Sequence, residues 1–592
     1  MPDPEQPALE CDVVMKGGIT SGIVYPRAIL RMKDTYRFRN VGGTSAGAIA
    51  AAVTAAAEFG RATGGFARLE RVPDEIAQHL SELFQPTPAL RPLYRVFAAL
   101  TQRGLASGLL AAILAYLPWM LAALGLAALA AVAVWLGGTS PLVAAALGAL
   151  VFLVLDVLVL AFCLYRDLMK RLPKYDFGLC PGPTQAGARF PGLSDWLAVL
   201  IEQCAGRTGA LQGSDPLSFG DLKDAKPSIT LRMMTSNLSL GTAHALPDLP
   251  DGNYFWNADE LRRLLPGWVV ASMVRKAGPP DRNSGLYRFP PPEQVPVILG
   301  VRMSLSFPLL IPAVPLHRID FAVKGADGRP VMRRVLFSDG GITSNFPVHF
   351  FDRLLPSRPT FGVSLDDLEA EGLGRRVYMP MKAISQHRFP IQAPDTLPAF
   401  ALAIVNTARE WQDRQLSALS GFRERVSHVY LRKNEGGLNL NMPSQTIDDL
   451  IGMGERAGLL MVGQPAPGDE TAFDFPDHQW RRFLIGYAQL ERLLEELRQS
   501  WGDPDDPHSF AATIRRTAEA PASYAQSSKH WRASVWQRID DLVGLSRNTF
   551  GTRLRGDGRI PRHRARLRLV PELGDDEDPQ ESAAEDLPRA ED

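Results

Sequence analysis

The hydrophobic pattern of the chain is dominated by one long apolar region. Between positions 104 and 165 the sequence contains a single charged residue, Asp156. Two apolar stretches in this region, about 109–136 and 141–164, each exceed the roughly 20 residues that a helix needs to cross the hydrocarbon of a bilayer. A Gly-Gly-Thr-Ser turn separates them. The pattern therefore predicts a transmembrane helical hairpin, which we assign to 103–171.

Two spans return the chain to the side of the membrane on which it began, so the segments before and after the hairpin share one compartment. Basic residues gather at the open end of the hairpin: Arg103, Arg166, Lys170, Arg171 and Lys174. The positive-inside rule then predicts a multi-pass protein of a bacterial inner membrane with its folded part in the cytoplasm. The alternative is a hairpin buried in a large soluble core. Asp156, deep within its span, suggests a helix contact within a chain or in a homo-oligomer.

Outside the hairpin, short apolar runs alternate with helical patterns, which predicts an α/β fold with a sheet covered on both faces. Sheet-forming runs occupy 11–15, 36–41, 228–234, 297–301, 335–338 and 359–364. Helix-forming sequence follows the first two runs. After about position 398 the spacing of apolar residues becomes helical, over 399–426, 446–461 and 479–501.

These patterns predict how the chain is divided. The α/β domain consists of two parts, 1–102 and 172–397, separated by the hairpin 103–171. A mainly helical region follows over 398–570, and an acidic tail poor in apolar residues over 571–592 is expected to be disordered.

The charge balance argues against nucleic acid as a partner. The 592 residues include 64 basic and 64 acidic ones, so no net charge attracts polyanions. A basic stretch, 547–568, has two readings, a contact with anionic lipid headgroups or a solvated surface. The four cysteines show no metal-binding spacing, and no metal site is expected.

Ser45 is the strongest candidate for chemistry. It is the central residue of Gly43-Thr44-Ser45-Ala46-Gly47, between a strand-like run and an alanine-rich helix. A serine on a sharp strand-to-helix turn presents its hydroxyl, the flanking glycines allow close backbone approach, and the helix N-terminus favours developing negative charge. This context predicts a nucleophile elbow.

Two further motifs accompany the elbow. Glycines follow the first strand at Gly17, Gly18 and Gly22, where free backbone N–H groups can form an oxyanion hole. Downstream, the strand at 335–338 ends in Asp339-Gly340-Gly341. An acid at a strand end is placed to meet a serine at the same edge of a sheet.

These motifs, in this order, resemble those of the patatin-like phospholipase family. Segments 302–308 and 345–347 resemble the family's sequence on either side of its aspartate. The resemblance implies a patatin-like three-layer α/β/α fold and a serine acyl hydrolase with a Ser–Asp dyad, no catalytic histidine and no cofactor or metal. It makes Ser45 the nucleophile, Asp339 the base, and the amides around Gly17 and Gly18 the oxyanion donors.

The glycine loop departs from the family pattern. Ile19 stands where the family has its third glycine, and Ser21 stands at the usual basic position, while Lys16 precedes the loop. A rival enzyme reading is a Ser–Asp–His triad. Its candidate histidines are His349, His387, His428, His478, His508, His530 and His563, of which His349 is better explained as a core or near-site residue.

The sequence therefore predicts a membrane-anchored lipid acyl hydrolase that cleaves acyl esters of phospholipids or related lipids. Membrane lipid is expected to be both its substrate and its anchor. Two alternatives remain at this level. One is a catalytically degenerate scaffold, and the other is a regulated effector that uses the same chemistry to damage membranes.

Overall fold

The computed structural model describes most of the chain. The described residues are 7, 9–18, 21–207, 214–249, 252–282, 284–326, 328–367, 376–380, 394–432, 435–437, 439–440, 442–465, 472–517 and 529–549. The predicted acidic tail and most of the basic stretch 547–568 lie outside them, as does Ile19.

A mixed β-sheet forms the centre of the body. Within the described residues it has eleven strands in the order β10-β11-β9-β1-β2-β3-β8-β7-β5-β6, with β4 paired to β3. The strands are β1 (Leu9–Met15), β2 (Tyr36–Gly43), β3 (Thr230–Asn237), β4 (Thr242–Leu246), β5 (Tyr254–Trp256), β6 (Tyr287–Arg288), β7 (Val314–Lys324), β8 (Pro330–Asp339), β9 (Thr360–Asp367), β10 (Val377–Tyr378) and β11 (Val426–Leu431). The neighbours β11, β9, β1, β2 and β3 run parallel, whereas β8 is antiparallel to β3.

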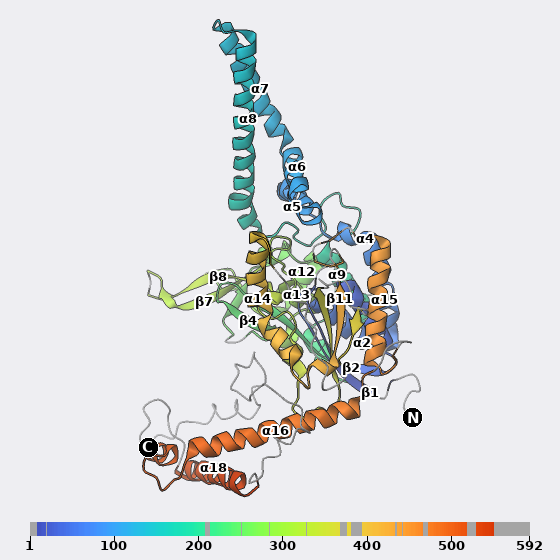
Figure 1. The fold of residues 1–592 in the computed structure, drawn as a ribbon, viewed down its shortest axis with the longest axis vertical. Helices are drawn as coiled ribbons and strands as arrows, with labels where there is room; N and C mark the ends of the chain where they lie inside the picture. The colour runs from blue at the N-terminus through green and yellow to red at the C-terminus, as the bar shows by residue number, and fades with distance from the viewer. Residues whose placement is uncertain are drawn as a thin grey trace.

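Helices pack on this sheet and extend from it (Figure 1). They are α1 (Val24–Met32), α2 (Ala46–Phe59), α3 (Gly65–Glu70), α4 (Val72–Leu83), α5 (Arg91–Arg103), α6 (Leu105–Ala115), α7 (Leu117–Leu136), α8 (Pro141–Tyr165), α9 (Leu193–Cys204), α10 (Phe219–Lys223), α11 (Ala258–Arg262), α12 (Gly267–Lys276), α13 (Val297–Ser304), α14 (Leu397–Ala418), α15 (Ser444–Met461), α16 (Phe475–Trp501), α17 (Phe510–Thr517) and α18 (Lys529–Thr549). Helix α2 packs on β2, β3 and α9, and α1 packs on α15. The predicted α/β class is confirmed.

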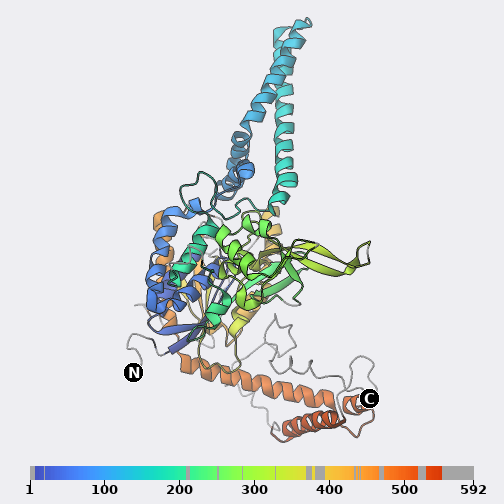
Figure 2. The same cartoon turned by 180° about the vertical axis from the view of Figure 1, so that it is seen from behind.

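Helices α7 and α8 form a long hairpin that projects away from the body (Figures 1 and 2). Both are long and apolar enough to cross a membrane. Each contains an apolar stretch of 18 residues of which 11% is buried. The first apolar stretch is divided at Tyr116, because Pro118 occupies the first turn of α7 and cannot continue the helix hydrogen bonding of α6. At the base, the Tyr116 hydroxyl donates to the buried carboxylate of Asp167 over 2.9 Å.

Two secondary-structure predictions are wrong. Residues 297–301 belong to α13 and not to a strand, and every residue of this helix is buried. A short apolar run without periodicity suits a buried helix as well as a buried strand, so the sequence pattern could not decide between them. The helix predicted over 399–426 ends at Ala418, and 426–431 is strand β11, which pairs with β9.

The last described helices form a separate arm on the side of the body away from the hairpin (Figure 1). Trp501 of α16, Ala511 of α17 and Val543 of α18 form a small apolar cluster there. In contrast, α15 and β11, which also follow position 398, pack within the α/β body.

Candidate active site

Ser45 occupies a strained turn between β2 and α2. Its backbone has φ 57° and ψ −126°, in the region that non-glycine residues rarely adopt and that costs them about 1–3 kcal/mol. Gly43 and Gly47 make the turn possible. A Cβ on Gly43 would lie 2.1 Å from the Gly47 carbonyl oxygen, and one on Gly47 would lie 2.2 Å from that of Met15. Ser45 therefore lies on a strained turn between a strand and a helix.

Asp339 ends β8 and lies beside Thr235 of β3. The Gly341 N–H donates to its Oδ1 over 2.7 Å, which fixes the carboxylate. Gly340 allows the close approach of β3, since a Cβ there would lie 2.1 Å from the Met234 carbonyl oxygen. Both glycines of the Asp-Gly-Gly motif thus help to position Asp339.

The structure brings Asp339 and Ser45 together in a buried site, with 4% of each residue exposed. Burial raises the pKa of Asp339 from 3.8 to about 6, and the Ser45 hydroxyl, the Gly341 amide and the Arg409 charge each lower it in part. Oδ2 of Asp339 has no hydrogen-bond partner of normal geometry in the described part of the chain. A carboxylate with this pKa can accept a proton from a hydroxyl near neutral pH.

The C-terminal end of α13 and the residues that follow it support both Ser45 and Asp339. The Ser45 N–H donates to Ser304 Oγ over 3.2 Å, and the Asp339 N–H donates to the Ser306 carbonyl over 3.0 Å. Arg302, fully buried, donates to Ser306 Oγ over 3.3 Å, and burial lowers its pKa to about 10. Segment 302–308 was selected from sequence only by resemblance, and the structure gives it a positioning role.

The glycine loop lies directly against Ser45. A Cβ on Gly17 would be 3.0 Å from Ser45 Cβ, and one on Gly22 would be 3.3 Å from Ala46 Cβ. The Gly17 N–H, however, donates to the Asn345 carbonyl over 3.0 Å, so it is already engaged. The N–H groups of Gly18 and Ala46 have no acceptor within the described residues. Ala46 is thus a donor candidate that sequence reasoning missed, although its place directly after the nucleophile could have indicated it.

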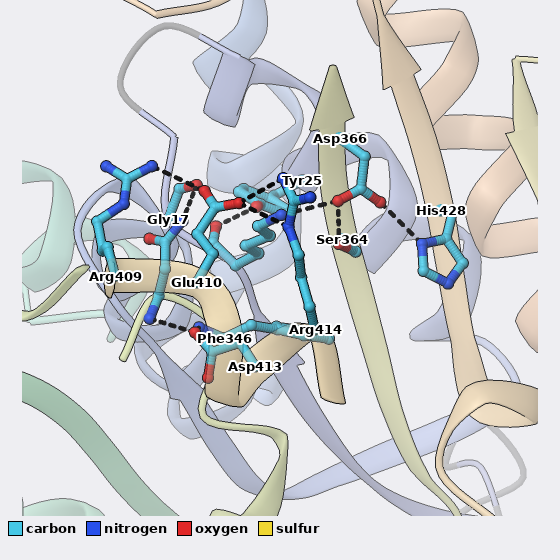
Figure 3. A network of polar contacts seen from close by, with 12 residues as sticks. Gly17, Tyr25, Phe346, Ser364, Asp366, Arg409, Glu410, Asp413, Arg414 and His428 are labelled. Atoms are coloured by element: carbon cyan, nitrogen blue, oxygen red, sulfur yellow. Dashed lines mark hydrogen bonds and ion pairs between the residues drawn. The ribbon is translucent and has the colours of Figure 1, made fainter. Parts of the chain in front are cut away.

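Lys16 forms an ion pair with Asp366, so its charge is not free to replace the basic residue that the patatin-like glycine loop usually carries. Its Nζ lies 2.7 Å from Asp366, which also accepts from Ser364 Oγ over 3.0 Å and contacts His428 Nδ1 at 2.8 Å (Figure 3). Burial raises the pKa of Asp366, but Lys16 and His428 outweigh it and hold the pKa well below its usual range. Ser21, which occupies the position where the patatin-like loop usually has a basic residue, is buried.

Asp413 of helix α14 forms hydrogen bonds with the segment 344–346, which follows Asp339. The Asp413 carboxylate accepts from the N–H groups of Asn345 over 2.6 Å and Phe346 over 2.9 Å (Figure 3), and from Ser344 Oγ over 3.0 Å. Asn345 in turn accepts from the Gly17 N–H. Asp413 therefore connects the Asp-Gly-Gly segment to the glycine loop, a role that nothing in its local sequence indicates.

The histidine triad gains no support from the described residues. His428 contacts Asp366 and not the dyad. His349 is buried, and burial lowers its pKa. His387 and His563 lie outside the described residues.

Replacing Asp413 with asparagine is expected to lower kcat for ester hydrolysis by about 10- to 100-fold with little change in KM. Hydrogen bonds to a charged acceptor contribute about 1.5–3 kcal/mol each, and the amide cannot accept from all three donors. The measurement is a kcat and KM comparison with Arg414→Gln as the control, since Arg414 contacts Glu410 at the partly exposed side of the same helix. An unchanged kcat for Asp413→Asn would show that this carboxylate does not position the dyad.

Comparison with known proteins gives one extensive match. No protein-family model matches the sequence. The RpoH suppressor of Rhizobium meliloti strain 1021 is 34% identical to this chain over an alignment 654 residues long. The alignment covers 95% of this chain and 99% of the relative. The chain belongs to the RpoH suppressor family. That name specifies no reaction for a member of the RpoH suppressor family.

A solved structure is also similar, but only distantly. The crystal structure of VipD from Legionella pneumophila aligns over 94% of this chain and 87% of its own, with 12% sequence identity and a TM-score of 0.28. At this TM-score the alignment supports no argument about the RpoH suppressor family's fold or activity.

Proposed function

We propose that this member of the RpoH suppressor family is a membrane-anchored lipid acyl hydrolase of the patatin-like type. The observation that carries the proposal is a strained, buried Ser45 beside the buried Asp339, whose pKa burial raises to about 6. A structural serine at a turn has no need of an unfavourable φ, and backbone strain of this kind concentrates at functional sites. Carboxylates with shifted pKa values are also enriched at functional sites.

The geometry supports a two-step acyl transfer. Asp339 takes the Ser45 hydroxyl proton while Oγ attacks the ester carbonyl carbon. The bond to the lipid alcohol breaks, and Asp339 gives the proton to the departing oxygen, which leaves an acyl-serine. Asp339 then takes a proton from water as the water oxygen attacks the acyl carbon. Ser45 leaves and regains the proton, so that one ester and one water become a fatty acid and an alcohol.

The oxyanion formed in each step needs hydrogen-bond donors close to Ser45. The amides of Gly18 and Ala46 are the available candidates, since neither has another acceptor in the described part of the chain. One donor of this kind contributes roughly 3–4 kcal/mol to transition-state stabilisation. The reaction as written consumes no cofactor.

The test is release of free fatty acid from vesicles of phosphatidylethanolamine and phosphatidylglycerol that carry the full-length protein. Mass spectrometry should detect fatty acid and lysophospholipid in equal amounts. A folded wild-type protein that releases neither would favour the alternative of an inactive scaffold. Active protein that lyses the host only on induction would favour the membrane-damaging effector.

We also propose that α7 and α8 cross a bacterial inner membrane and that the α/β body and the helices after it face the cytoplasm. Support comes from the length and low burial of both helices and from the basic residues at the base of the hairpin. Membrane lipid would then be both anchor and substrate. The domain limits 103–171 for the hairpin, and 1–102 with 172–397 for the hydrolase domain, belong to the same proposal.

The proposed topology predicts which introduced thiols are accessible from outside the cell. All four native cysteines are buried. Thr139→Cys, at the exposed tip of the hairpin, is expected to react with a membrane-impermeant maleimide in intact spheroplasts, because the tip would face the periplasm. Ser284→Cys, on an exposed turn of the body, should react only after lysis. Equal labelling of both in intact spheroplasts would exclude this topology.

A further inference from the structure

An apolar cavity lies beside the candidate active site and runs along α2. It contains about 820 Å³ of empty space, its open mouth included. Its near end is bordered by Gly22, Ala46 and Leu305, one residue from each of the three segments that frame Ser45. None of the described residues that line it is Asp, Glu, Lys, Arg or His. A polar headgroup would find no charged partner in this cavity.

One face of α2 forms the floor of the cavity. Ala46, Ile49, Ala50 and Val53 line it at helical spacing, and Thr54 follows. From Ala46 to Thr54 the helix rises about 12 Å, so the cavity extends well beyond the reacting carbon. The alanines leave room on this face that larger side chains would fill.

Helices α4 and α9 form the opposite wall. Ile76 and Leu80 of α4 and Trp196 and Leu200 of α9 line the cavity. Figure 1 shows α4 and α9 on the side of the body from which the hairpin projects, close to α5 and α6 at its base. An extended apolar group that leaves the membrane at the base of the hairpin would reach the cavity on this side.

We propose that this cavity holds one fatty acyl chain of the substrate, entering from the membrane side between α2 and α4, and that Ala50 limits the chain length accepted. This inference rests on the proposed function, since the acyl carbon would have to meet Ser45 at the near end of the cavity.

The catalytic test compares p-nitrophenyl acetate, octanoate and palmitate with full-length protein in detergent. Ala50→Phe, which fills the middle of the cavity, is expected to lower kcat/KM for octanoate and palmitate at least about tenfold while acetate changes less than about threefold. Leu80→Trp, on the facing wall, should act in the same direction. Ala77→Phe is the matched control, because Ala77 is exposed on α4 and does not line the cavity.

A binding test separates this inference from the chemistry. A diazirine-bearing palmitate is crosslinked to Ser45→Ala protein, which cannot turn over. Crosslinks are expected within 46–54 and 72–83, and Ala50→Phe should remove them. Crosslinks only elsewhere, or equal losses for acetate and palmitate in both cavity variants, would overturn the proposal. Crosslinks in the cavity of a wild-type protein that cleaves no ester would instead defeat the proposed function and leave a lipid-binding cavity.

Discussion

Ser45→Ala is expected to abolish labelling by a fluorophosphonate probe and to lower kcat for ester hydrolysis by at least about 10⁴-fold. Alanine removes the only atom that can form the acyl-enzyme, while the strained turn still has the same flanking glycines. The measurement is gel fluorescence of detergent-solubilised protein together with fatty acid release. Ser81→Ala, at an exposed serine of α4, is the control and should label normally.

Labelling that persists in Ser45→Ala would place the reactive serine elsewhere and remove the basis of the mechanism. Because Ser45 is buried with only 4% exposed, the labelling should be repeated with lipid vesicles present. A wild-type protein that is folded but unlabelled under both conditions would favour the scaffold alternative.

Asp339→Asn is expected to reduce kcat by about 10²–10⁴-fold, the usual contribution of a general base. The amide nearly preserves the shape and can still accept from the Gly341 N–H, but it cannot take the serine proton. Because the pKa of Asp339 is about 6, wild-type kcat/KM should rise with pH and reach a plateau above that value. The measurement is a pH–rate profile between pH 4.5 and 8.5 with a neutral ester substrate. A profile that is flat through pH 6 would show that Asp339 is not the base.

The same substitution should stabilise the fold at high pH. The folded pKa of about 6 lies above the ordinary value of 3.8, so the folded state binds the proton more tightly and stability falls as pH rises through that interval. Above pH 6 the penalty amounts to about 3 kcal/mol. Asp339→Asn removes it, and the variant should therefore unfold at a higher temperature than wild type at pH 8 but not at pH 4. A lower unfolding temperature at both values would mean that the carboxylate is structural.

Local sequence was enough to predict the strand, turn and helix around Ser45, because the three are contiguous and the glycines are required by close backbone approach within a few residues. The sequence also predicted the parallel strands β1 and β9, because a fully buried strand is a continuous apolar run. The same signal failed at 297–301, where a buried helix has an equally apolar sequence. It also failed at 426–431, where no strand was predicted and the expected helix extended to Val426, the first residue of β11.

The supports of the site were harder to predict because they depend on contacts between distant segments. Asp413 lies on a helix far along the chain from Ser45, and its three partners come from the segment after Asp339. Ser304 meets the Ser45 amide only because α13 packs beside α2. Likewise, the engagement of the Gly17 amide by Asn345 could not be foreseen from the spacing of the glycines.

The position of the hairpin in the chain also has a consequence for biosynthesis. Ser45 is translated before α7 and α8, whereas Asp339 is translated after them. Since domains fold as they emerge from the ribosome, the nascent chain holds its serine without its carboxylate until the apolar helices have been made. On the proposed topology, the protein would be delivered to its membrane before it could attack any lipid, and no separate inhibitor would be needed during synthesis.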